Sequence, residues 1–254
     1  MLNHESRDGV RETRRFFLRG TLAVPAMLAM GRWSSAAAAR GGTDDVRAFL
    51  DEWAAKAKAF VADETENQEA FLAELCAAIA RQDRASFPGR RFTAYDKNGM
   101  RTGPVGNDDI FQLIEIELEP NRVIKPHNHV GYDFISLCMK GEARARHFEP
   151  EPGSPDPSQV GASLKVCEVS NSLLVPGRIS TLTRTRANVH AFTAGEQGAT
   201  FLDFGIKHPP SERGPKHFSV LEIEEEAADP KRRTFEAKWL GNIYAKKAPE
   251  APKK

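Results

Sequence analysis

Three histidines in this sequence have the type and the spacing of metal ligands. His127 and His129 are two residues apart, and His190 lies much later in the chain. In a β-strand, residues i and i+2 point to the same face, so His127 and His129 can bind one ion together. A third imidazole from a distant strand would complete the set and leave coordination positions open for a substrate and oxygen. The spacing therefore predicts a mononuclear metal site that is open to chemistry.

A plainer interpretation of the same residues stays open. His127 and His129 follow Pro126, so they could be exposed polar side chains in a turn. Imidazole binds iron, manganese, nickel, copper and zinc, and the sequence alone does not select among these metals.

Residues 1–39 have the three-part plan of an export signal. A basic segment around Arg14 and Arg15 precedes a short apolar stretch at 20–31 and four alanines at 36–39. The paired arginines before Phe16, Phe17 and Leu18 resemble a twin-arginine signal. The apolar stretch is shorter than the about 20 residues of a transmembrane helix. We expect a periplasmic protein that the twin-arginine machinery exports already folded; an ordinary basic, alanine-rich leader is the alternative.

Composition excludes some classes of partner. The 254 residues carry 36 basic and 35 acidic side chains, so no global field draws the chain to nucleic acid or to anionic membranes. Cys76, Cys138 and Cys167 have no metal-knuckle spacing. A Cys138–Cys167 disulfide is possible in an oxidising compartment, but the sequence does not establish it.

The chain changes character near residue 90. Apolar residues recur at helical spacing between 43 and 84, which predicts two or three helices packed outside the following domain. From 92 onward the sequence predicts many short strands separated by turns, with a tight turn at Lys140-Gly141 and a surface loop at 150–159. This pattern is typical of a mostly β barrel or jelly roll. The predicted segments are an export signal (1–39), a helical segment (40–90), a β-barrel (91–226) and a basic tail (227–254).

The order of motifs resembles the cupin superfamily. His127-x-His129-x3-Asp133-x7-Gly141, then Pro176-Gly177 and His190, match its two motifs in order and spacing. Three segments resemble, more narrowly, the cysteamine dioxygenase and plant cysteine oxidase family of thiol dioxygenases. They are the His-x-His-x-Gly opening, the segment Asn-Val-His-x-Phe-Thr-Ala at 188–194, and Phe-Leu-Asp at 201–203 followed by Pro-Pro at 209–210. This resemblance covers roughly residues 70–225 and implies a double-stranded β-helix.

The resemblance also implies a site. His127, His129 and His190 correspond to the ligands of an Fe(II) ion, and Asp203 to a residue that orients the substrate amine. A turn-stabilising role for Asp203 is the alternative. Asp133 replaces the usual cupin glutamate; with His127 and His129 alone it would make a set of two histidines and one carboxylate. We expect three histidine ligands, with Asp133 hydrogen-bonded to one of them or to a metal-bound water.

Two departures from the family pattern affect the expected substrate. Ser211 stands where the family has a tyrosine, and Lys216-His217-Phe218 stands where further Cys and Tyr residues are expected. Tyr132 could supply a phenol from another direction, although a packed core tyrosine is the alternative. The expected function is an iron-dependent thiol dioxygenase that uses O2 and a small aminothiol or an N-terminal cysteine. The alternatives are a cupin metalloenzyme for a non-thiol substrate and a periplasmic cupin that binds a metal or small molecule without turnover.

Overall fold

Two helices precede nine strands in the described part of the chain. In the computed structural model, α1 spans Gly42–Ala62 and α2 spans Gln68–Arg81. Asn67 caps α2, because its side-chain oxygen accepts hydrogen bonds from the N–H groups of Glu69 and Ala70. The helices expected between 43 and 84 are therefore present.

The described residues are 42–63, 67–83, 87, 92–96, 99–107, 110–129, 131–186, 188–208 and 218–241. Residues 1–39, predicted as an export signal, lie outside them. Among the described helices, neither combines the length and the hydrophobicity that crossing a membrane would require.

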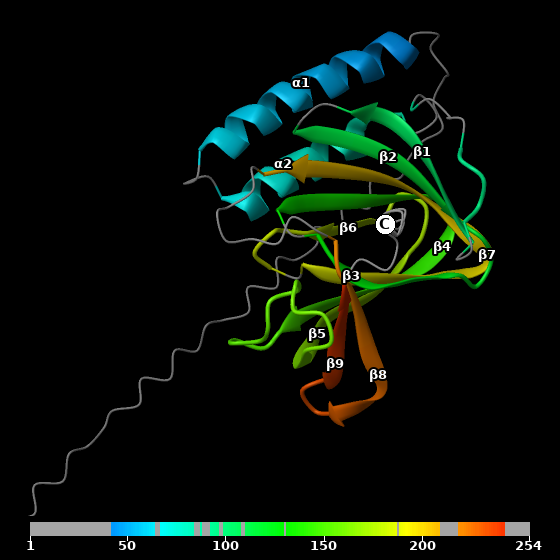
Figure 1. The fold of residues 1–254 in the computed structure, drawn as a ribbon. Helices are drawn as coiled ribbons and strands as arrows, with labels where there is room; N and C mark the ends of the chain where they lie inside the picture. Colours follow the sequence, from blue (N-terminus) through cyan, green and yellow to red (C-terminus); the bar gives the residue numbers. More distant parts are fainter. Residues whose placement is uncertain are drawn as a thin grey trace, which may run out of the picture. The chain divides into compact units, whose positions relative to one another are not determined.

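The strands form one continuous hydrogen-bonded system. They are β1 (Met100–Asn107), β2 (Phe111–Leu118), β3 (Val123–Asn128), β4 (Tyr132–Pro150), β5 (Ser163–Leu174), β6 (Ile179–Leu182), β7 (Val189–Lys207), β8 (Val220–Asp229) and β9 (Thr234–Gly241). Their order is β1-β2-β7-β3-β8-β9-β5-β4-β6, with a further pairing of β7 to β4. The predicted class, mostly β in a jelly roll with the N-terminal helices outside, is confirmed (Figure 1).

The longest strands, β4 and β7, take part in both halves of the jelly roll. Residues 132–141 of β4 pair with 199–207 of β7, and residues 143–148 pair with 189–194. The predicted tight turn at Lys140-Gly141 is wrong, because the chain continues in the same direction through a register shift there. Gly141 has φ +65°, so the glycine creates a bulge that bends the strand instead of reversing it.

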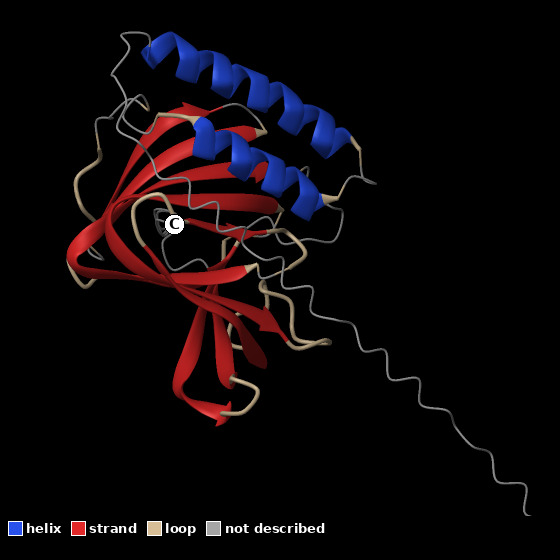
Figure 2. Cartoon of the chain, turned by 180° about the vertical axis from the view of Figure 1, so that it is seen from behind, coloured by secondary structure: helices blue, strands red, loops and turns tan. Residues whose placement is uncertain are grey.

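The two faces of the sheet have different coverings. Ile135, Leu137, Leu202 and Phe204 pack with α1 and α2 in one apolar cluster. Figure 2 shows both helices on this side of the strands. Because successive side chains of a strand point to opposite faces, the residues next to these in the sequence, such as Phe201, face the barrel interior. The metal-site residues described below belong to this interior face.

The sheet extends past the predicted barrel boundary at residue 226. β8 continues to Asp229, and β9 pairs with both β8 and β5 inside the segment predicted as a basic tail. Trp239 of β9 is buried. Since β3 pairs with β8 and β4 with β7, the strands β7, β3, β8, β9, β5 and β4 close into a ring.

We predict that Gly141→Ala strongly destabilises the protein. A Cβ at Gly141 would lie 2.0 Å from the carbonyl oxygen of Gly198, at a φ of +65°. Left-handed backbone and overpacking each cost about 1–3 kcal/mol, so we expect a loss of at least about 3 kcal/mol. Gly153→Ala is the matched control: φ there is +83° and a Cβ meets nothing within 4 Å. It should cost only about 1–2 kcal/mol of backbone strain. Urea unfolding of both variants measures the difference, and equal losses would contradict the proposed backbone clash.

Candidate metal centre

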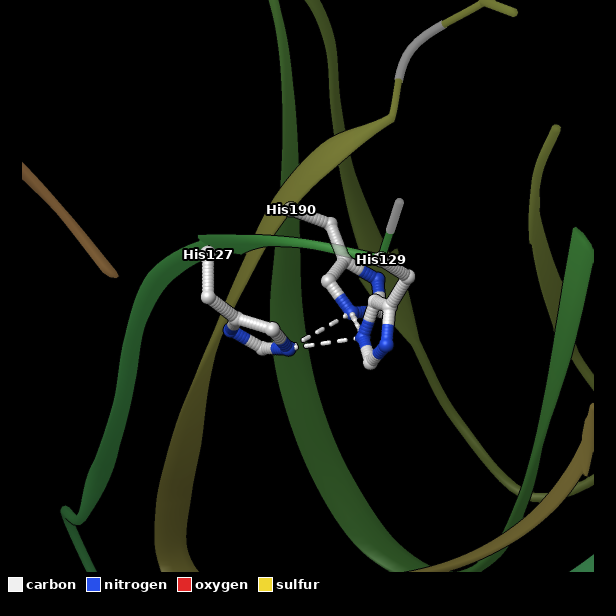
Figure 3. Close-up of side chains that lie close together, drawn as sticks. All are labelled: His127, His129 and His190. Carbon is white, nitrogen blue, oxygen red and sulfur yellow. Dashed lines mark hydrogen bonds between the residues drawn. The ribbon is translucent and has the colours of Figure 1, made fainter. Parts of the chain in front are cut away.

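The three predicted histidines come together at neighbouring strands. His127 of β3 pairs directly with His190 of β7, and His129 follows the end of β3. Their Nε2 atoms point at one another (Figure 3). The separations are 2.9 Å for His127–His129, 3.0 Å for His129–His190 and 3.1 Å for His190–His127. The three side chains could therefore hold a single metal ion.

The protonation of the cluster suits metal binding. Burial lowers the pKa of His127 to about 4, and it lowers the pKa values of His129 and His190 well below their usual range. Nδ1 of His127 lies 2.7 Å from the carbonyl oxygen of Lys125, so the neutral ring donates there and presents the lone pair of Nε2 to the cluster. One proton can bridge only two of the three nitrogens, whereas a metal ion satisfies all three. The donor set thus fits a divalent ion that prefers neutral imidazole.

The number of protein ligands bears on what the site could do. Three imidazoles would leave further coordination positions of a bound ion for exogenous ligands, which is the arrangement of a catalytic metal site and not of a closed structural one.

Aromatic side chains surround the histidine cluster. The rings of Phe218 and His127 have centroids 4.4 Å apart, and those of Phe134 and His129 are 4.3 Å apart. Phe192 lies 4.8 Å from His190. An apolar surround excludes water and strengthens electrostatic interactions at the site.

Asp203 faces the barrel interior, as its position on β7 requires. It is two residues from Phe201, which packs on Phe192, and it pairs in register with Ser136 of β4. Burial raises the pKa of Asp203 to about 7, and a hydrogen bond from Ser136 opposes the shift. Among the described residues, its Oδ1 is buried without a hydrogen-bond partner. Burying a carboxylate oxygen without a hydrogen-bond partner costs folding free energy. Such an atom is expected where a bound ligand supplies the missing donor.

Asp133 lies away from the histidine cluster, contrary to the expectation that it bonds to one of the three histidines. Its Oδ1 accepts the N–H of Arg184 at 2.6 Å, and its Oδ2 lies 2.7 Å from Nε2 of His208. The reason is strand alternation: Phe134 points inward to His129, so Asp133 points to the opposite face, where His208 also contacts Phe60 of α1. Asp133 and His208 are both almost completely buried.

Tyr132 is connected to the cluster only indirectly. Its ring stacks on Phe134 with centroids 5.6 Å apart, and Phe134 in turn contacts His129. Its side chain is partly exposed. The arrangement matches a packing role more closely than a phenol placed at the metal.

A fourth histidine, which is not among the predicted site residues, lies beside the cluster. His147 of β4 pairs in register with His190, and their ring centroids are 5.9 Å apart. Its Nε2 lies 2.8 Å from Oγ of Ser180, and burial lowers its pKa to about 4. The sequence does contain a signal for this position. Arg144 and Arg146 are two residues apart and share the outer face of the strand, so His147 must point to the opposite, inward face.

No disulfide joins any two of the three cysteines in this structure. Cys138 is completely buried in the barrel interior, while Cys76 and Cys167 are partly exposed. The possible Cys138–Cys167 disulfide is therefore not formed.

No protein-family model matches this sequence, and no curated protein matches it either. Solved structures that resemble it include KdgF from Halomonas sp., at 15% identity over 47% of this chain and 89% of that chain, with a TM-score of 0.34. An RmlC-like cupin from Shewanella frigidimarina is 12% identical over 49% and 86%, with a TM-score of 0.33. A cupin superfamily protein from Desulfitobacterium hafniense is 14% identical over 46% and 84%, with a TM-score of 0.32. Likeness at this level carries no information about activity.

Proposed function

We propose that this protein is a mononuclear non-haem iron thiol dioxygenase for a small aminothiol or an N-terminal cysteine. The observation that carries the proposal is the convergence of three neutral imidazoles, two of them on buried residues, whose Nε2 atoms lie within 3.1 Å of one another. The resemblance of residues 188–194 and 201–203 to thiol dioxygenase segments supports the choice of substrate. An open set of three neutral ligands leaves the full charge of Fe(II) for an anionic thiolate.

Different residues would bind the metal, exclude water and orient the substrate at this site. His127, His129 and His190 would hold Fe(II), which when bound supplies a centre where thiolate and O2 meet and both oxygen atoms pass to sulfur. The overall change is R–SH + O2 → R–SO2H, so no external reductant is needed. Phe134, Phe192 and Phe218 exclude water beside the imidazoles. Asp203 would accept hydrogen bonds from the substrate ammonium through its unpartnered Oδ1.

A second candidate keeps the metal site and changes the substrate. Phe218 contacts both His127 and His129, in the segment where the thiol dioxygenase family has polar Cys and Tyr residues. An apolar ring at this place favours a metalloenzyme for a non-thiol substrate. A binding protein without turnover would have the same cluster and form no product.

The test is anaerobic reconstitution with Fe(II), followed by oxygen uptake and mass spectrometry with cysteamine, cysteine and a Cys-initiated peptide. The proposal expects one O2 consumed per thiol and a product heavier by two oxygen atoms. Stoichiometric iron with no thiol oxidation would reject the thiol dioxygenase and retain the metal site. Oxygen uptake with a non-thiol panel would then separate the second candidate from a binding protein.

We also propose that the twin-arginine machinery exports the protein to the periplasm. The proposal rests on Arg14-Arg15 and on the alanines at 36–39. Expression of the full chain with its own leader should give a shortened protein in the periplasmic fraction. Replacing both arginines by lysine should retain the unprocessed chain in the cytoplasm; unchanged export would overturn the route.

A further inference from the structure

His129 differs from the other two cluster histidines in how its backbone is held. His127 and His190 lie within paired strands, whereas β3 ends at Asn128, one residue before His129. A residue outside the ladder has no strand neighbour to bond its N–H and C=O groups. The imidazole of His129 therefore depends on some other contact for its position.

The side chain of Asn188 makes that contact. Its Oδ1 accepts the N–H of His129 at 3.0 Å, and its Nδ2 donates to the carbonyl oxygen of His129 at 3.2 Å. The same Nδ2 donates to the carbonyl oxygen of Thr183 at 2.9 Å. One side-chain amide thus bonds both main-chain groups of His129. The carbonyl oxygen of His129 also accepts the N–H of Tyr132 at 3.0 Å within the turn, so Asn188 is the partner of the His129 N–H and one of two partners of its carbonyl.

The turn that carries His129 is tied down at its other end as well. The N–H of Arg184 donates to Asp133, whose second oxygen is paired with His208. The N–H of His208 donates to the carbonyl oxygen of Gly131 at 2.8 Å. The segment from 129 to 133 is therefore anchored to the segment from 183 to 188 at two points.

The 183–188 segment is itself braced by the first turn of α2. The hydroxyl of Thr185 donates to Oε1 of Gln68 at 3.0 Å, and Arg186 forms an ion pair with Glu69. Thr183 and Arg186 bond to each other across the turn. A chain of contacts thus runs from α2 to the backbone of His129, outside the strand ladder.

We propose that Asn188 is a positioning residue of the metal centre, which holds His129 in the ligand geometry through its backbone. The inference rests on the metal site of the proposed function, but not on thiol oxidation. Partners of metal ligands typically contribute 10–100-fold to metal affinity. Asn188 acts on a ligand's main chain instead of its ring, so its loss frees His129 while leaving His127 and His190 in their strands.

The test is Co(II) titration of purified protein, with visible absorption as a readout of the ligand field. Asn188→Ala should bind Co(II) about 10–100-fold more weakly and give an altered spectrum, because the imidazole of His129 is no longer held in the ligand geometry. The matched control is Asp229→Ala, which removes the two hydrogen bonds that this carboxylate accepts from the N–H groups of Lys231 and Arg232 in the turn between β8 and β9. The control should unfold at lower urea and keep the wild-type Co(II) affinity.

Each outcome bears on the proposal. Unchanged Co(II) affinity in Asn188→Ala, or a loss no greater than in Asp229→Ala at equal loss of stability, would overturn it. If Asn188→Ala does not fold, Asn188→Ser is titrated in the same way. Failure of the wild-type protein to bind Co(II) would reject the metal centre and this inference together. Normal Co(II) binding without thiol oxidation would reject only the proposed activity.

Discussion

His190→Ala should abolish stoichiometric metal binding while leaving the barrel folded. Nε2 of His190 lies within 3.1 Å of both other cluster nitrogens, so the variant keeps only two ligands. We expect the affinity for Fe(II) or Co(II) to fall more than about 100-fold, beyond the range typical of a partner outside the ligand set. Elemental analysis and equilibrium titration measure the loss, and circular dichroism checks the fold.

His147→Ala is the matched control for that experiment. His147 lies on the next strand, directly opposite His190, and is buried to a similar degree. Its Nε2 is occupied by Ser180, so the variant should keep a full complement of metal. Equal losses in both variants would place the ion elsewhere, and wild-type affinity in His190→Ala would contradict the three-histidine site.

Asp203→Asn should reduce turnover of amine-bearing thiols without removing the metal. A hydrogen bond to a charged group contributes about 1.5–3 kcal/mol, which corresponds to about a 10–150-fold loss in kcat/KM. The loss should be confined to substrates with an ammonium group, because a thiol with an alkyl group in its place has no donor for Oδ1. Comparing cysteamine with ethanethiol separates these effects, and equal losses for the two thiols would give Asp203 a purely structural role.

The pH dependence of Asp203 supplies an independent readout. Its pKa is raised to about 7, from an ordinary value of 3.8, so the free protein holds this proton more tightly than the unfolded chain does. The contribution to stability is therefore full below about pH 4 and is lost as pH rises through about 7. Activity with cysteamine should rise over the same upper range, because only the carboxylate pairs with an ammonium. Asp203→Asn should remove both dependences in urea unfolding and in pH–rate profiles.

The alternation of side chains along a strand predicts which residues share the interior face with the metal ligands. It does not predict contacts between residues that are far apart in the sequence. His127, His129 and His190 came from spacing, and Asp203 from a resemblance, because each belongs to a recognisable local pattern. The sequence predicts a tight turn at Gly141 where the structure has a bulge, because a glycine with positive φ suits both equally well. The roles of Asn188 and of the Asp133–His208 pair could not be predicted, because Asn188 bonds a backbone group 59 residues away and Asp133 pairs with a side chain 75 residues away in the chain.

The closure of β3 onto β8 has a consequence for when the metal centre can form. The strand that carries His127 is bonded to Val220, and β8 needs β9, which ends at Gly241, to complete the ring. During synthesis the chain emerges from its N-terminus, so both ligand segments leave the ribosome before the strands that fix them exist. We therefore expect an ion to be bound stably only after the last strand is released, and a nascent chain stalled before residue 220 should retain no metal.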